Sequence, residues 1–329
     1  MRRSIRVAVA LLATATCTTL VAACGLQSGG AVPLDVKPGS IQPVDALKGV
    51  SLTVGSKEFT EQVILGYVIE FAMMAAGADV HDLTNIQGSN STHQALRTGQ
   101  VDLTYEYTGT DWINYLGHET PIPDATKQFE AVRDESLAKE GIVWVDPAPM
   151  DNTYALAMNQ QTAKETGVKT LSDYAALVKK DPAKASTCLE TEFTSRQDGF
   201  PGMAAAYGFD SAQAKTSILQ TGLIYSATAA GNECKFGEVY TTDGRILGLN
   251  LVVLRDDKQF FPHYNATLNI RKKIADQYPQ IAQIMKPVSD AITNEEITKL
   301  NASVDVDGKD PATVARQWMV DKGFVKMPA

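Results

Sequence analysis

The 329-residue sequence has few of the residues on which metal and catalytic sites usually depend. It contains only four Cys and four His, without a Cys-x-x-Cys pair or a cluster of Cys and His. A structural zinc site has little support, because such sites gather four Cys or His ligands. Hydrolase, zinc-protease, P-loop and dinucleotide-binding motifs are also absent. We therefore expect no metal and no cofactor, and a binding protein in preference to an enzyme.

Basic residues are also scarce, with 30 Lys and Arg against 38 Asp and Glu and a net charge of −8. No broad basic surface is available to neutralise phosphates, so the composition argues against a nucleic-acid partner. A content of 44% hydrophobic and 21% charged residues is typical of a globular protein. A chain of 329 residues exceeds the usual size of a single core, so two domains are expected.

Long apolar runs are lacking except at the N-terminus. Residues 7–23 carry no charge and follow the cationic stretch Met1–Arg6, an order typical of a secretory signal. The run is too short and too interrupted by Thr to span a membrane, and no later stretch reaches the roughly 18 apolar residues needed. It ends in Val21-Ala22-Ala23-Cys24, which resembles the bacterial lipobox.

The lipobox resemblance implies that residues 1–23 are removed and that Cys24 is lipidated; an ordinary signal with a chance Cys is the alternative. Several lipid chains would hold the protein on the outer face of the bacterial cytoplasmic membrane. Removing three Arg and no acid changes the net charge from −8 to −11. Residues 24–49 contain turn formers and no sustained periodicity, so we expect a tether there.

Two Cys remain in the predicted mature chain, Cys188 and Cys234. An exported compartment permits disulfides, and a lone pair of this kind is more often bridged than free. We expect a disulfide between them; two buried thiols are the alternative.

Strand and helix patterns alternate after the tether, which is typical of parallel sheets with right-handed crossovers. The first series predicts strands at 51–55, 81–87 and 101–105 and helices at 63–76 and 92–98. The second series predicts strands at 154–158, 186–193 and 237–241 and helices at 171–178 and 202–206. An apolar run at 246–254 predicts a further strand. The remainder is mostly helical and closes with a helix between Asp310 and Gly323, which we expect to pack on a lobe.

Polar side chains follow all three strands of the first series. They are Ser56-Lys57, Gly88-Ser89-Asn90 and Tyr107-Thr108-Gly109-Thr110. Ligands of open parallel sheets bind at the carboxyl ends of the strands. The sequence therefore predicts a binding cleft at this edge of the first lobe.

Six segments together carry a more specific pattern. They are Val54–Gln62, Gln87–Asn90, Asp102–Thr110, Asp151–Leu156, Glu192–Gly199 and Val239–Gly244. They resemble the substrate-binding proteins of osmoprotectant ABC importers, which bind glycine betaine, choline and related quaternary amines. The resemblance implies an α/β, two-lobed fold of the type II periplasmic-binding-protein class, with a mostly parallel sheet flanked by helices in each lobe. Residues 50–150 and 256–329 would form lobe 1, and residues 151–255 would form lobe 2.

The resemblance also assigns residues to the ligand. A box of four tyrosines around a cationic head would be Tyr107, Tyr154, Tyr240 and Tyr264. Lys57, Thr110 and Arg196 look like the partners of a carboxylate. Asn152 stands where the family has an aspartate or asparagine, and its neutral amide leaves less negative charge beside the cation.

These expectations describe a lipid-anchored receptor that captures a betaine-like solute and delivers it, as a monomer, to an ABC permease. A zwitterion needs a cation-tolerant end and an anion-binding end, and the assigned residues supply both. Because these residues come from both halves of the chain, the ligand would bridge the lobes and favour their closure. A cell-envelope hydrolase or a ligand sensor using the same cleft is the alternative.

Overall fold

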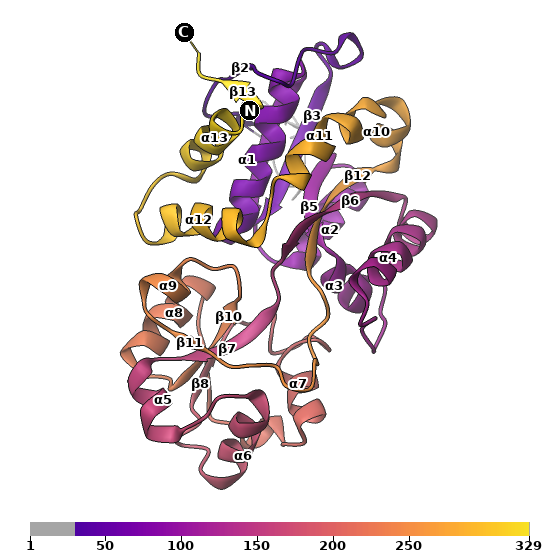
Figure 1. Ribbon diagram of the computed structural model, residues 1–329. Coiled ribbons are helices and arrows are strands. Elements are labelled where there is room, and N and C mark those ends of the chain that lie inside the picture. Colours follow the sequence, from indigo (N-terminus) through magenta and orange to yellow (C-terminus); the bar gives the residue numbers. More distant parts are fainter. Residues whose placement is uncertain (1–29, 329) are drawn as a thin grey trace, which may run out of the picture.

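Residues 30–328, which the computed structural model describes, fold around two sheets that lie in separate lobes (Figure 1). The first sheet has the order β1-β4-β3-β5-β12-β6. Its strands are β1 (Gly30–Ala31), β3 (Ser51–Lys57), β4 (Asp79–Ile86), β5 (Leu103–Tyr107), β6 (Ile142–Asp151) and β12 (Asn265–Arg271). β3 is parallel to β4 and β5, as the strand and helix alternation predicts. β12 is antiparallel to β5 and β6.

Helices surround the first sheet (Figure 1). They are α1 (Thr60–Ala75), α2 (Ser89–Thr98), α3 (Thr108–Thr110), the π-helical turn η2 (Asp111–Tyr115), α4 (Ala125–Glu140), α10 (Lys272–Gln277), α11 (Gln280–Asp290), α12 (Asn294–Asp305) and α13 (Pro311–Asp321). α1 packs against β3, β4 and α13, and its nearly continuous apolar sequence explains why most of its residues are buried. The predicted closing helix is confirmed as α13, which Asp310 caps by accepting the N–H of Thr313.

The second lobe has the strand order β11-β7-β10-β8-β9. Its strands are β7 (Tyr154–Met158), β8 (Thr187–Leu189), β9 (Thr216–Ile218), β10 (Phe236–Tyr240) and β11 (Val252–Val253). Its helices are α5 (Gln160–Thr166), α6 (Leu171–Lys180), α7 (Phe200–Tyr207), α8 (Thr221–Ala230) and α9 (Arg245–Gly248), with a 3₁₀ turn η3 (Ser211–Gln213). β8 is parallel to β9 and β10, whereas β7 is antiparallel to β10.

Both sheets are therefore mixed, and less parallel than the sequence pattern suggested. The antiparallel strands arise because the chain passes between the lobes twice, from β6 to β7 and from β11 to β12. β7 and β12 each enter their sheet from the cleft, at the edge where the parallel strands end. They must therefore run opposite to those strands, and loops from both lobes meet at one place.

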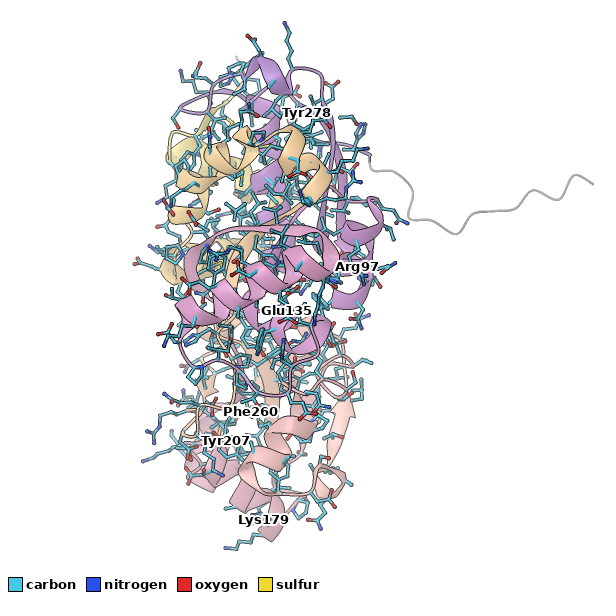
Figure 2. The ribbon with its side chains drawn as sticks, turned by 90° about the vertical axis from the view of Figure 1, so that its right-hand side faces the viewer. Arg97, Glu135, Lys179, Tyr207, Phe260 and Tyr278 are labelled. Carbon is cyan, nitrogen blue, oxygen red and sulfur yellow. A yellow bond between two sulfur atoms is a disulfide. The ribbon has the colours of Figure 1, made fainter. Side chains whose placement is uncertain are left out.

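The returning passage is fastened to lobe 2 before it reaches β12. The phenol of Tyr207 donates a hydrogen bond to Asp256, and the N–H of Lys258 donates to the Tyr207 oxygen at 3.0 Å. Figure 2 shows Tyr207 and Phe260 in this lobe. The next residue, Phe261, thereby approaches the aromatic residues of the cleft.

The prediction of a tether at residues 24–49 is wrong from residue 30 onward, because these residues pack on lobe 1. β1 pairs with β4, and β2 (Lys37–Pro38) pairs with β13 (Val325–Lys326). A 3₁₀ turn η1 (Asp45–Leu47) follows. The side chains of Val36, Ile41 and Leu47 are buried against lobe 1, so these scattered apolar residues anchor the segment. Cys24 lies outside the described residues.

The apolar run 246–254 is also not one strand. Its first part belongs to α9, and only Val252–Val253 joins the sheet as β11. Asp243 accepts the N–H of Arg245 and starts a helical turn. A continuous apolar run does not by itself distinguish a buried strand from a short helix. No helix among residues 30–328 combines the length and apolarity that crossing a membrane requires.

Cys188 and Cys234 lie within lobe 2 and are joined by a disulfide with Cα atoms 5.6 Å apart. The bond closes a loop of 46 residues, for which chain entropy gives a stabilisation of about 2–4 kcal/mol. We expect the double variant Cys188→Ala/Cys234→Ala to lose that much free energy of unfolding in a urea titration. Dithiothreitol should destabilise the wild-type protein and leave the double variant unchanged; equal effects on both would contradict the bond.

Candidate ligand-binding site

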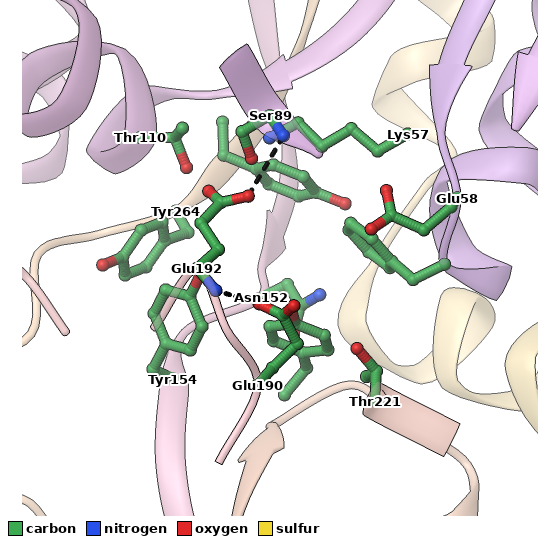
Figure 3. A pocket seen from close by; sticks show the side chains of 13 residues that line it. Lys57, Glu58, Ser89, Thr110, Asn152, Tyr154, Glu190, Glu192, Thr221 and Tyr264 are labelled. Atoms are coloured by element: carbon green, nitrogen blue, oxygen red, sulfur yellow. Dashed lines mark hydrogen bonds between the residues drawn. The ribbon is translucent and has the colours of Figure 1, made fainter. Parts of the chain in front are cut away.

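A cavity between the two lobes brings together most of the residues expected to bind a ligand (Figure 3). Seven of the eight line it: Lys57, Tyr107, Thr110, Asn152, Tyr154, Tyr240 and Tyr264. The eighth, Arg196, contacts two lining residues. The cavity lies where β3 and β5 of lobe 1 end, opposite the start of β7 and the end of β10 in lobe 2. The passage of the chain between lobes thus assembles the site.

The four tyrosines belong to one continuous arc of aromatic rings. The ring centroid of Tyr154 lies 5.3 Å from that of Tyr240 and 5.3 Å from that of Tyr264. Tyr240 continues to Phe59 at 5.1 Å, and Phe59 continues to Tyr107 at 6.2 Å. Phe59 therefore connects the first tyrosine to the other three. Sequence reasoning missed it, although its place in a loop directly after β3 was an available signal.

The phenols of the arc are neutral at physiological pH, and burial raises the pKa of Tyr107, Tyr154 and Tyr264 well above the usual value. The Tyr107 hydroxyl donates to Glu61 at 2.7 Å, and the Tyr264 hydroxyl donates to Asp198 at 2.7 Å. These two hydrogen bonds fix the orientation of their rings. A neutral ring keeps the quadrupole that attracts a cation to its face.

The three residues expected to hold a carboxylate are already paired within the protein. Nζ of Lys57 lies 2.7 Å from Oε1 of Glu106, and both side chains are buried. Arg196 forms a two-pronged pair with Asp198, with Nε to Oδ1 at 2.7 Å and Nη2 to Oδ2 at 2.5 Å. Nη2 also lies 3.4 Å from the hydroxyl of Thr110. Removing Arg196 would therefore leave a buried carboxylate without its partner.

Glu192 occupies the remaining edge of the Arg196 guanidinium. Its Oε1 accepts from Nη1 at 2.7 Å, and its Oε2 accepts the N–H of Ser89 at the start of α2 at 3.0 Å (Figure 3). Burial raises the pKa of Glu192, but the charges of Arg196 and Lys57 and the Ser89 N–H outweigh it and hold the pKa at about 2. Glu192 is therefore negatively charged at physiological pH and joins lobe 2 to lobe 1.

Two further carboxylates line the cavity, those of Glu58 and Glu190. Glu58 accepts the N–H of Gly88 at 3.1 Å, and Glu190 accepts the N–H of Glu192 at 2.5 Å. Burial raises the pKa of Glu190. Sequence reasoning passed over these acids, because carboxylates are frequent in an acidic protein. The structure shows that they give the cavity wall a surplus of acidic groups.

Asn152 is bound at both ends of its amide. Its Nδ2 donates to Glu61 at 2.8 Å, and its Oδ1 accepts the N–H of Thr242 at 3.3 Å. Glu61 is 2% exposed and accepts four hydrogen bonds, from Asn152, Tyr107, Thr242 and Asn301. Burial raises the pKa of Glu61, and the four hydrogen bonds lower it. These donors come from both lobes, so a single carboxylate fastens the lobes together behind the cavity.

One group of residues with metal-ligand chemistry occurs in the described chain, although the sequence predicted none. Donor atoms of His93, Asp111 and Glu140 lie within 4.8 Å of one another. His93 Nε2 is 3.1 Å from Glu140 Oε1. Burial and the charge of Glu140 raise the pKa of Asp111 well above its usual value.

Comparison with known proteins places this geometry in a family. Residues 50–321 match the family described as the substrate binding domain of ABC-type glycine betaine transport system. A glycine-betaine-binding protein of Pseudomonas aeruginosa is 34% identical over 274 residues, which cover 82% of this chain and 87% of that protein. A carnitine transport binding protein of Listeria monocytogenes is 31% identical over 277 residues, covering 83% and 87% of the two chains.

The fold agrees with the sequence similarity. A solved structure described as a glycine betaine/carnitine/choline ABC transporter superposes with a TM-score of 0.67 at 27% identity, over 83% of this chain and 99% of that one. The expected two-lobed fold of type II periplasmic binding proteins is thereby confirmed. Since the family match extends over most of the described residues, the chain belongs to the substrate-binding domains of ABC-type glycine betaine transport systems.

Proposed function

We propose that the protein captures a quaternary amine in the cavity between its lobes and presents it to an ABC permease for import. The arc formed by Tyr107, Phe59, Tyr240, Tyr154 and Tyr264 is the observation that supports this ligand class. A quaternary ammonium group donates no hydrogen bond, and neutral ring faces attract it through their quadrupoles. The acidic cavity wall adds electrostatic attraction. The family consists of binding proteins, not enzymes, and does not favour the hydrolase alternative.

Such proteins act outside the cytoplasm, beside the permease that they supply. We propose that a lipid at Cys24 anchors this one to the outer face of the membrane. The first described residues belong to lobe 1, where β1 pairs with β4 at the edge of the sheet (Figure 1). An anchor there would leave the cleft free to face the permease.

Calorimetric titration with glycine betaine, proline betaine, choline and carnitine tests the proposal. We expect at least one of them to bind more tightly than millimolar. Tyr240→Ala should weaken that ligand about 2- to 30-fold, because one ring contributes about 0.5–2 kcal/mol to binding a cation.

Tyr278→Ala is the matched control, because Tyr278 is a partly buried tyrosine of lobe 1 outside the cavity lining. It should leave the affinity unchanged. Failure of all four amines to bind the wild-type protein, or equal losses in the two variants, would contradict the proposed function.

A further inference from the structure

Three side chains that can bind a metal ion meet inside lobe 1. His93 lies in α2, Asp111 begins η2 and Glu140 ends α4, and one donor atom of each lies within 4.8 Å of the other two. Nε2 of His93 and Oε1 of Glu140 are 3.1 Å apart. Zinc lies about 2.0–2.2 Å from nitrogen and oxygen ligands, so the donors around one ion are separated by roughly 3–4 Å. Small side-chain movements would bring all three donors onto one ion.

Hydrogen bonds within the protein do not account for these carboxylates. Asp111 is fully buried, and neither of its carboxylate oxygens has a partner among the described residues. Oε2 of Glu140 also lacks one there. Buried polar groups are hydrogen-bonded as a rule, and a buried charge is paired or binds a metal. The contact between His93 and Glu140 serves one of the four carboxylate oxygens and leaves Asp111 unexplained.

The surroundings of Asp111 favour a cation. Burial raises the pKa of Asp111, and the charges of three nearby Glu carboxylates raise it further. Lys57 lowers it, but Lys57 is itself paired with Glu106 at 2.7 Å. Arg97 lies 3.7 Å from Glu140, but its side chain is 46% exposed, so solvent screens its charge. A divalent ion would offset the remaining negative charge.

The donor set indicates which kind of ion fits. One imidazole nitrogen and two carboxylate oxygens suit zinc and related transition metals, whereas calcium and magnesium prefer oxygen ligands alone. Three protein ligands leave a fourth position of a tetrahedral zinc ion for water. The side chains of His93 and Glu140 are each 8% exposed, so an ion can reach them from solvent.

The group lies directly behind the lobe 1 wall of the ligand cavity. Asp111 follows Thr110, which lines the cavity. The ring of His93 stacks on that of Tyr115, with centroids 3.8 Å apart and planes at 17°. The Tyr115 hydroxyl donates to Glu106 at 3.0 Å, and Glu106 is the carboxylate that pairs with the lysine of the site. An ion at this place would hold the wall in position.

We propose that His93, Asp111 and Glu140 bind one divalent transition-metal ion, represented by Zn²⁺, which fastens α2, η2 and α4 to one another. The site is separate from the cavity that binds the amine. The inference therefore does not depend on the proposed function.

The test measures Zn²⁺ binding to the whole chain after a chelator has removed bound metal. We expect one Zn²⁺ per chain in equilibrium dialysis with metal analysis, and a higher Tm in the presence of Zn²⁺. Asp111→Asn and Glu140→Gln keep the shape of each side chain and remove its charge. Each should weaken Zn²⁺ binding at least about 10- to 100-fold, since loss of an outer-shell partner alone costs that much.

The metal-free variant gives a second measurement. Without Zn²⁺, Asp111→Asn should have a Tm no lower than that of the wild-type protein, because it removes a buried carboxylate that has no partner. With Zn²⁺, its Tm should no longer rise. Glu140→Gln, at the more accessible end of the group, tests the same site if Asp111→Asn folds poorly.

His118→Gln is the matched control. His118 also pairs with a glutamate of α4, Glu135 at 2.9 Å, but this pair has no third ligand within reach. The variant should keep the wild-type affinity for Zn²⁺. Less than one Zn²⁺ per chain, or an equal loss in His118→Gln, would overturn the inference. Binding that survives in Asp111→Asn and Glu140→Gln would also overturn it, because the ion would then be held at the surface only.

Discussion

Glu61→Ala is expected to lower the free energy of unfolding by at least about 3 kcal/mol and to weaken ligand binding. The reason is that four buried donors, on Tyr107, Asn152, Thr242 and Asn301, would lose their acceptor together. Each unsatisfied buried donor costs about 1–3 kcal/mol. Urea unfolding and calorimetry would measure the two effects.

The isosteric variant Glu61→Gln should show a smaller loss of stability. Its amide oxygen can still accept hydrogen bonds, whereas its NH2 group replaces the second acceptor and would face two of the donors. Glu295→Ala is the matched control: Glu295 also lies in the first turn of a helix, but its side chain is 77% exposed. Both changes remove a favourable charge from a helix N-terminus. A loss in Glu61→Ala no larger than in Glu295→Ala would contradict the central role of this carboxylate.

The second large effect concerns the pH dependence of stability. Glu70 in α1 is fully buried, and neither of its carboxyl oxygens has a hydrogen-bond partner among the described residues. Burial, together with the negative charge of Asp82, raises the pKa of Glu70 from 4.5 to about 9. Tyr67, one turn earlier, also contacts Asp82.

The pKa of Glu70 is higher in the folded state than in the unfolded state. Between pH 4.5 and about pH 9, Glu70 is therefore protonated in the folded protein and ionised in the unfolded chain. Its contribution to stability is therefore fully present below about pH 4.5 and is lost as the pH rises toward 9. The loss amounts to about 1.4 kcal/mol per pH unit, or roughly 4 kcal/mol between pH 5 and pH 8.

Glu70→Gln cannot titrate, so its free energy of unfolding should fall much less over that range in urea titrations at several pH values. The exposed Glu130→Gln should keep the wild-type slope. Parallel pH profiles for wild type and Glu70→Gln would contradict the raised pKa. Glu238 in lobe 2, whose pKa burial raises to about 8, adds a similar slope, and Glu238→Gln isolates its share.

Much of the fold was predictable because its information is local. Apolar spacing and the polar loops after each strand located β3, β5, β7 and β10, and Asp310 marked the start of α13. Residues 30–49 were not predictable, because their few apolar side chains have no period of their own. They are buried only because α1 and β13 offer them a surface.

The binding site, like the fold, has features that the sequence predicted and features that it did not. The family resemblance named the four tyrosines and the cations Lys57 and Arg196, and all of them except Tyr264 stand in one of the six short segments that carry it. The carboxylates with which these cations pair in the folded protein were not predictable. Glu192 and Ser89 are 103 residues apart, and Glu61 and Asn301 are 240 residues apart.

The sequence by itself determined the class of protein, the alternation of elements and the side chains offered to a ligand. These properties depend on residues that are neighbours along the chain. Only the tertiary structure decided that Phe59 completes the aromatic arc, that Glu61 fastens the lobes and that Glu192 occupies the edge of Arg196. The two passages of the chain between lobes bring distant carboxylates and donors within hydrogen-bond distance, and burial then sets their charge.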